Sequence, residues 1–195
     1  MPTKKPDRRT ARTRSALTSA FVELVLTRGF PDVSVEDIVA RADVGRSTFY
    51  LHFRSKDDIL KQSLVRPSGP LAALVGQDVS LASIIAQLEH FHSQRKLNRV
   101  FFAEPARAIW VCCLADLIEP RLSALLRISR GARPLLPLPM IAAQIAEVQI
   151  ALISNWLTSR NAMKAGAIAD ALIATTQANV AALLRGAGEK GGGPA

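Results

Sequence analysis

The sequence has few of the features that mark secreted, membrane or β-rich proteins. Cysteine occurs only at the adjacent positions Cys112 and Cys113, which cannot supply a disulfide framework and suit a reducing compartment. No uninterrupted apolar run approaches the roughly 18 to 20 residues that a membrane span requires. The basic N-terminus leads into an amphipathic segment, which is not the pattern of a secretory signal. Alternating β-branched runs are scarce. We therefore expect an all-α, cytoplasmic protein without a membrane partner.

The side-chain groupings that enzymes and metal sites need are also missing. The sequence shows no Ser/His/Asp set, no carboxylate pair in an apolar setting and no glycine-rich phosphate loop. His90 and His92 lie two positions apart, about 200° around a helix, so they cannot share one metal ion. We therefore expect no enzymatic activity, no metal and no cofactor.

Basic residues outnumber acidic ones, and the formal net charge is +9. The beginning of the chain is especially basic, with Lys4, Lys5, Arg8, Arg9, Arg12 and Arg14. Such an excess fits a polyanionic partner. We expect residues 1–9 to form a flexible basic arm, although a short basic run is more often simply a solvated terminus.

The segment after the arm predicts two helices and a tight turn. A helix from Arg9 to Arg28 is indicated by apolar residues at helical spacing: Leu17, Ala20, Phe21, Leu24 and Val25. Gly29 stands where a glycine commonly ends a helix. Ser34 is placed to cap a second helix of about two turns, which stops at Asp43-Val44-Gly45.

A third helix is predicted from Arg46 to Phe53. Phe49 and Phe53, four residues apart, point toward the first two helices, whereas the opposite face is polar and basic. Two short helices joined by a tight turn are typical of a helix-turn-helix, although an ordinary helical hairpin shows the same pattern. A fourth helix should begin after Ser55, with Lys56 at its first position, where a bound phosphate would offset the unfavourable placement of a cation.

The stretch VSVEDIVARADVGRSTFYLHFRSKDDIL strongly resembles the DNA-binding segment of TetR-family transcriptional regulators, and the similarity covers roughly residues 10 to 65. The resemblance implies a three-helix DNA-binding domain at 10–66, with its helix-turn-helix at 34–53, that binds double-stranded operator DNA. The DNA-binding residues it implies are Ser34, Arg46, Ser47, Thr48, Tyr50, Leu51, His52 and Lys56.

Three residues depart from the commonest family pattern: Gly45 replaces a capping Ser, Ser47 replaces a frequent Gly, and Leu51 replaces a second aromatic. Glycine is still an adequate N-cap. Leu51 could contact a thymine methyl group, or it could be a tolerated surface leucine. These departures bear on the operator sequence more than on the ability to bind.

The second half predicts a larger helical domain. Residues 66–80 are rich in proline, glycine and small residues and predict a domain boundary. Helices are expected over about 80–96, 105–130, 139–159 and 164–185, with a kink or break at Pro120. The resemblance implies that residues 67–187 bind an effector and form the dimer. Residues 188–195 are expected to be disordered.

Two sets of residues are candidates for these roles. The first set holds aromatic residues and one cysteine, which alone favour an ordinary core: Phe91, Phe101, Phe102, Trp110 and Cys113. The resemblance implies a pocket there for an apolar or amphipathic small molecule. The second set lies on the weakly charged last helices, where the resemblance implies a homodimer and burial within one subunit is the alternative: Ile145, Val148, Leu152, Trp156, Leu172 and Val180.

Together these features predict a homodimeric transcriptional regulator on a palindromic operator, acting as a repressor that a small ligand releases. The alternative is a helical ligand-binding or interaction protein whose helix-turn-helix is vestigial.

Overall fold

The computed structural model describes residues 8–76, 80–129, 132–159 and 163–185, and this part of the chain is almost entirely helical. Two strands of two residues each, β1 and β2, pair antiparallel. The elements are α1 (Arg8–Arg28), α2 (Val35–Ala42), α3 (Arg46–Tyr50), α4 (Lys56–Ala73), α5 (Leu81–Ser93), α6 (Arg95–Phe101), α7 (Ala106–Ile128), β1 (Arg133–Pro134), α8 (Leu138–Thr158), α9 (Ala165–Leu183) and β2 (Leu184–Arg185). The predicted all-α fold is confirmed.

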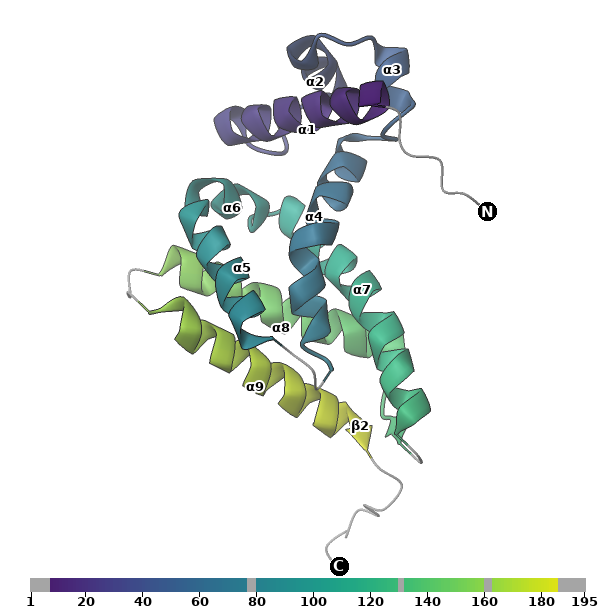
Figure 1. Ribbon diagram of the computed structural model, residues 1–195, viewed down its shortest axis with the longest axis vertical. Helices are drawn as coiled ribbons and strands as arrows, with labels where there is room; N and C mark the ends of the chain where they lie inside the picture. The colour runs from purple at the N-terminus through teal and green to yellow at the C-terminus, as the bar shows by residue number, and fades with distance from the viewer. Residues whose placement is uncertain (1–7, 77–79, 130–131, 160–162, 186–195) are drawn as a thin grey trace, which may run out of the picture.

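Helices α1, α2 and α3 form a small unit at one end of the molecule (Figure 1). The buried face of α1 consists of the predicted stripe: Leu17, Ala20, Phe21, Leu24 and Val25. Gly29 ends α1 with φ +86°, a left-handed conformation that glycine adopts without steric strain. Local sequence signals therefore determine where this unit begins and turns.

Helix α4 leaves the small unit and descends into the body formed by α5 to α9 (Figure 1). It runs through Pro67 and Pro70, so residues 66–73, where the sequence predicted a domain boundary, are helical. Leu71 is fully buried, and α4 packs along α7. This burial outweighs the backbone hydrogen bonds that the prolines remove.

In the body, the long helices α7, α8 and α9 pack in sequence, and α5 lies against α9. The sequence predicts a kink or a break at Pro120, and the structure excludes the break: Pro120 lies inside α7 without ending it, because Ile118 and Leu122 on either side are fully buried. The helix expected over 80–96 ends earlier, and α6 follows it as a separate short helix.

Helix α8 is the element most similar to a membrane span. It is long and apolar enough by length and composition alone, and half of its most apolar window is buried. Its buried face includes Ile145, Gln149 and Ile153 and packs against α7 and α9. This packing is that of a core helix in a helical body.

Candidate nucleic-acid interface

The exposed side of α3 carries most of the predicted DNA-binding residues. Arg46, Ser47 and Tyr50 are exposed to solvent. Leu51, directly after the helix, is 83% exposed. Thr48 and His52 lie half-buried beside them. The helix ends at Tyr50 and the chain turns through Leu51 and His52, so α3 is shorter than predicted, but the predicted face is open to a partner.

Burial of two phenylalanines determines which side of α3 is exposed. Phe49 and Phe53 are 0% and 2% exposed, and their ring centroids are 5.9 Å apart. Before them, Asp43 ends α2 in the left-handed conformation with φ 54°, and Gly45 is the extended N-cap of α3. A short turn and an aromatic anchor therefore orient the helix.

Arg46 forms an ion pair with Glu36 of α2. The two side chains are 63% and 57% exposed, so the pair contributes little to stability and a DNA phosphate or base could replace the carboxylate. The pattern of α3 alone does not predict this pair, because Glu36 lies in the preceding helix, ten positions before Arg46.

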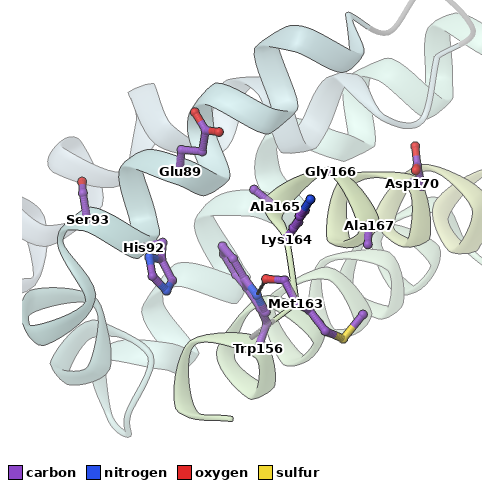
Figure 2. Close-up of a pocket in the computed structure, with 10 residues that line it drawn as sticks. All are labelled: Glu89, His92, Ser93, Trp156, Met163, Lys164, Ala165, Gly166, Ala167 and Asp170. Atoms are coloured by element: carbon purple, nitrogen blue, oxygen red, sulfur yellow. Dashed lines mark hydrogen bonds between the residues drawn. The ribbon is translucent and has the colours of Figure 1, made fainter. Parts of the chain in front are cut away.

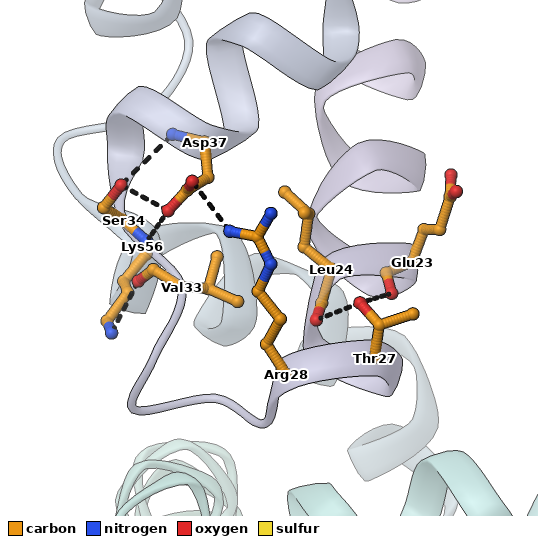
Figure 3. Close-up of polar contacts among 8 residues, drawn as sticks. All are labelled: Glu23, Leu24, Thr27, Arg28, Val33, Ser34, Asp37 and Lys56. Atoms are coloured by element: carbon orange, nitrogen blue, oxygen red, sulfur yellow. Dashed lines mark hydrogen bonds and ion pairs between the residues drawn. The ribbon is translucent and has the colours of Figure 1, made fainter.

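Ser34 caps α2 through a reciprocal pair of hydrogen bonds (Figure 3). Its hydroxyl accepts from the backbone N–H of Asp37 at 3.1 Å, and its own N–H donates to the Asp37 carboxylate at 2.9 Å. Arg28 donates to the same carboxylate at 2.8 Å. The Ser34 hydroxyl also donates to the Asp37 carboxylate, at 2.5 Å. This hydrogen bond, followed by those from the Ser34 N–H and from Arg28, lowers the pKa of Asp37 to about 2. Ser34 thus has a structural role in addition to its predicted DNA contact.

Lys56 is directed toward the loop between α1 and α2 (Figure 3 shows its bond to Val33). Its ammonium donates to the backbone oxygens of Phe30, Pro31 and Val33 at 2.9, 2.9 and 2.8 Å. It also lies 4.8 Å from the centroid of the Phe30 ring. An ammonium has three hydrogens to donate, and these contacts use all of them. The geometry therefore favours a structural role for Lys56 over the predicted phosphate contact.

A cavity of about 160 Å³ lies where the small unit meets the body. It is bordered by α1, α4, α5, α6 and α7, and its lining combines apolar side chains with a few polar ones: Val22, Leu60, Ser63, Leu64, Pro67, His90, Phe91, Gln94, Leu97, Asn98, Phe101 and Trp110. Three of the five predicted pocket residues, Phe91, Phe101 and Trp110, are in this lining.

The other two predicted pocket residues lie outside it. Phe102 packs against Trp110, with centroids 4.3 Å apart, and Cys113 is buried. Burial raises the pKa of the Cys113 thiol to about 11, which makes it a poor nucleophile. The indole N–H of Trp110 donates to the hydroxyl of Ser68 at 3.0 Å and so joins α7 to α4. The sequence pattern does not predict that α1 and α4 line the 160 Å³ cavity, because these helices meet α5, α6 and α7 only in the folded chain.

A wider groove of about 770 Å³ lies between α5, the end of α8 and the start of α9 (Figure 2). Trp156 lies in it with its indole N–H donating to the Met163 carbonyl at 3.0 Å, and the His92 ring lies 5.4 Å away. The carboxylates of Glu89 and Asp170 and the ammonium group of Lys164 also line the groove. Trp156 is therefore engaged within the subunit rather than exposed for dimerisation.

The other predicted dimer residues divide into two groups. Ile145 and Leu172 are fully buried in the subunit core, so they cannot form an outer face. Val148 is 36% exposed, and Leu152 and Val180 are half-buried. Apolar spacing alone could not separate these groups, because α8 and α9 are apolar on more than one side.

Within the described ranges, no group of three or more His, Cys, Asp or Glu residues could hold a metal ion.

Sequence comparisons match the N-terminal part of the chain. Residues 17–62 match the family model described as "Bacterial regulatory proteins, tetR family". The uncharacterized HTH-type transcriptional regulator YxbF of Bacillus subtilis is 33% identical over 64 residues, which cover 32% of this chain and 17% of YxbF. The uncharacterized HTH-type regulator TtgW of Pseudomonas putida is 29% identical over 86 residues, covering 42% of this chain and 64% of TtgW. The chain thus aligns with less than two thirds of either relative.

Solved structures extend the similarity of fold to most of the chain. A TetR-family regulator from Syntrophomonas wolfei has a TM-score of 0.58 at 19% identity, covering 87% of this chain and 95% of that one. One from Streptococcus agalactiae has a TM-score of 0.56 at 23% identity, covering 87% and 96%. FadR of Thermus thermophilus, a TetR-family repressor solved with lauroyl-CoA, has a TM-score of 0.52 at 21% identity, covering 92% and 100%. At these identities the likeness shows the fold.

Replacing Lys56 with methionine tests its structural role. We expect Lys56→Met to lower the free energy of unfolding by about 1 to 3 kcal/mol, because partly buried carbonyls lose a charged donor. Chemical denaturation measures this, with Lys61→Met, an exposed lysine of the same helix, as the control. Wild-type stability in Lys56→Met would contradict the assignment.

Replacing Ser34 with alanine tests the cap of α2. In the wild type, the stabilisation linked to Asp37 is complete above its unfolded-state pKa of about 3.9 and is lost as the pH falls through about 2. Ser34→Ala should raise the pKa of Asp37 toward its ordinary value and reduce stability by about 1 kcal/mol. NMR titration of the carboxyl carbon measures the pKa, with exposed Ser15→Ala as the control. A pKa still near 2 would show that Ser34 does not set it.

Proposed function

We propose that this protein is a sequence-specific DNA-binding transcriptional regulator, because residues 17–62 match the TetR family model and the fold is similar to that of solved TetR-family regulators. The observation that carries the proposal is the open side of α3, opposite the buried Phe49 and Phe53. A short helix anchored on one side and polar on the other suits insertion into a major groove.

The exposed residues suggest which DNA contacts are made to bases and which to phosphates. Arg46 can leave Glu36 and donate to guanine or to a phosphate, and the Tyr50 hydroxyl can donate to a phosphate oxygen. Leu51 offers an apolar surface that matches a thymine methyl group. Base recognition would then combine one charged and one apolar contact.

The proposed assembly is a homodimer formed through the outer faces of α8 and α9. Val148, Leu152 and Val180 remain accessible there. Around them lie exposed small residues of α9, namely Ala174, Thr175, Ala178 and Ala181. A pair of subunits would present two α3 helices to one side of the duplex, so the operator would be an approximate palindrome with half-sites about 34 Å apart or a multiple of that spacing.

The proposed regulation is release from DNA by a small ligand in the 160 Å³ cavity. Val22 of α1 and Leu64 of α4 line it, so an occupant would touch the DNA-binding unit directly. A cavity near 150 Å³ holds a molecule of about the size of benzene. The cavity therefore suits a single-ring or short-chain apolar compound, and a larger effector would require it to expand.

Duplex binding tests the regulator function. Sequences selected from a random duplex pool at low salt should bind the wild type, with affinity falling steeply as salt rises. Arg46→Ala should weaken binding by about 5- to 150-fold, equivalent to about 1 to 3 kcal/mol. Arg127→Ala, an exposed arginine of α7, is the control and should not change the affinity. If the wild type selects no duplex, the helix-turn-helix is vestigial and the protein is a helical ligand-binding or interaction protein.

Toluene is a suitable probe of the cavity. It should raise the thermal unfolding midpoint of the wild type in a concentration-dependent way, because it binds the folded state. Leu97→Phe adds a ring to the cavity wall and should abolish this increase. Scanning calorimetry with and without toluene measures both proteins. An equal increase in the two proteins would place the toluene site elsewhere.

A further inference from the structure

Gln149 is a fully buried polar residue in the middle of α8. Its Nε2 donates to the Leu71 carbonyl of α4 at 3.3 Å and to the Thr176 hydroxyl of α9 at 2.9 Å. Its Oε1 is also buried, and it has no hydrogen-bond partner among the described residues. One side chain thus joins three helices while leaving one of its own polar atoms unsatisfied.

The demands of stability do not explain this glutamine. A buried acceptor without a donor costs free energy, whereas an apolar side chain of similar shape would avoid that cost. The Leu71 carbonyl does not depend on it, because it also accepts from the backbone N–H of Leu74 at 3.2 Å. A core position that breaks a packing rule in this way is a candidate for a functional role.

The helices that Gln149 joins have different roles in the proposed regulator. At its first turn, α4 is attached to the DNA-binding unit, because Asp58 accepts from the Arg54 N–H at 2.9 Å and Lys56 bonds to the α1–α2 loop. At its other end, Ser68 accepts from Trp110 and Leu71 accepts from Gln149. Ser68 and Leu71 are three residues apart and share one face of α4. Hydrogen bonds are directional, so they restrict sliding and rotation that apolar packing tolerates.

We propose that Gln149 is a positioning residue that fixes the C-terminal half of α4 relative to α8 and α9. This inference rests on the homodimer proposed above. There, the hydrogen bond from Gln149 to the Leu71 carbonyl sets the separation of the two α3 helices and thus the fit to the operator. Gln149 contributes to the placement of α4 and not to the stability of the fold.

The test compares Gln149→Met with the wild type. Methionine keeps an unbranched side chain of similar length but cannot donate a hydrogen bond. We expect an unchanged or higher unfolding midpoint, faster hydrogen exchange at the non-proline amides of residues 67–73, and at least about fivefold weaker binding to the selected duplex. The dependence of affinity on salt should be unchanged, because no phosphate contact is lost.

Two further variants separate positioning from general packing. Ile153→Met changes a fully buried residue one turn along the same face of α8 and should alter neither exchange in α4 nor duplex affinity. Thr176→Val removes only the α9 partner of Gln149 and should give an intermediate effect.

The outcomes distinguish this inference from the proposed function. Exchange and affinity equal to wild type in Gln149→Met would overturn it, as would a loss of affinity accompanied by an equal loss of stability. If the wild type binds no duplex, the proposed function fails, and exchange in residues 67–73 alone decides whether Gln149 positions α4.

Discussion

The orientation of the exposed side of α3 depends on the burial of Phe49 and Phe53. With both rings inside the small unit, the side of α3 that carries Arg46 and Tyr50 must face outward. Aromatic side chains bury a large area and pack with specific geometry, so they hold a helix of five residues that could not persist alone. The charged and polar residues around them can then change partners without disturbing the fold.

A second set of aromatic contacts runs from the small unit to α6 and the cavity. Phe21 of α1 contacts Phe30 edge-on at 6.0 Å and stacks on Phe101 of α6 at 6.2 Å. Phe101 lines the cavity, as does Trp110 farther along it. A ligand that displaced Phe101 would therefore press directly on α1. Close-packed interiors transmit such shifts because they contain few voids to absorb them.

The sequence predicted features that depend on neighbouring residues. The buried stripe of α1, the left-handed Gly29 and the cap at Ser34 each involve contacts within a few positions, so spacing and residue type were sufficient. The contacts that the sequence did not predict join distant segments. Lys56 reaches Val33, 23 positions away, and Trp110 reaches Ser68, 42 positions away. No local pattern contains those contacts, nor the packing that keeps α4 helical through Pro67.

The course of α4 suggests why an effector beside its middle could alter its direction. Pro67 and Pro70 cannot donate to the carbonyls one turn earlier, so α4 is least braced between its first turn, which is attached to the small unit, and its hydrogen bonds to Trp110 and Gln149. The cavity borders this stretch at Leu64 and Pro67. With the C-terminal end held, a ligand pressing there would swing the DNA-binding unit rather than shift the whole helix. In the proposed regulator, such a ligand would change DNA affinity only to the extent that it binds two orientations of α4 unequally.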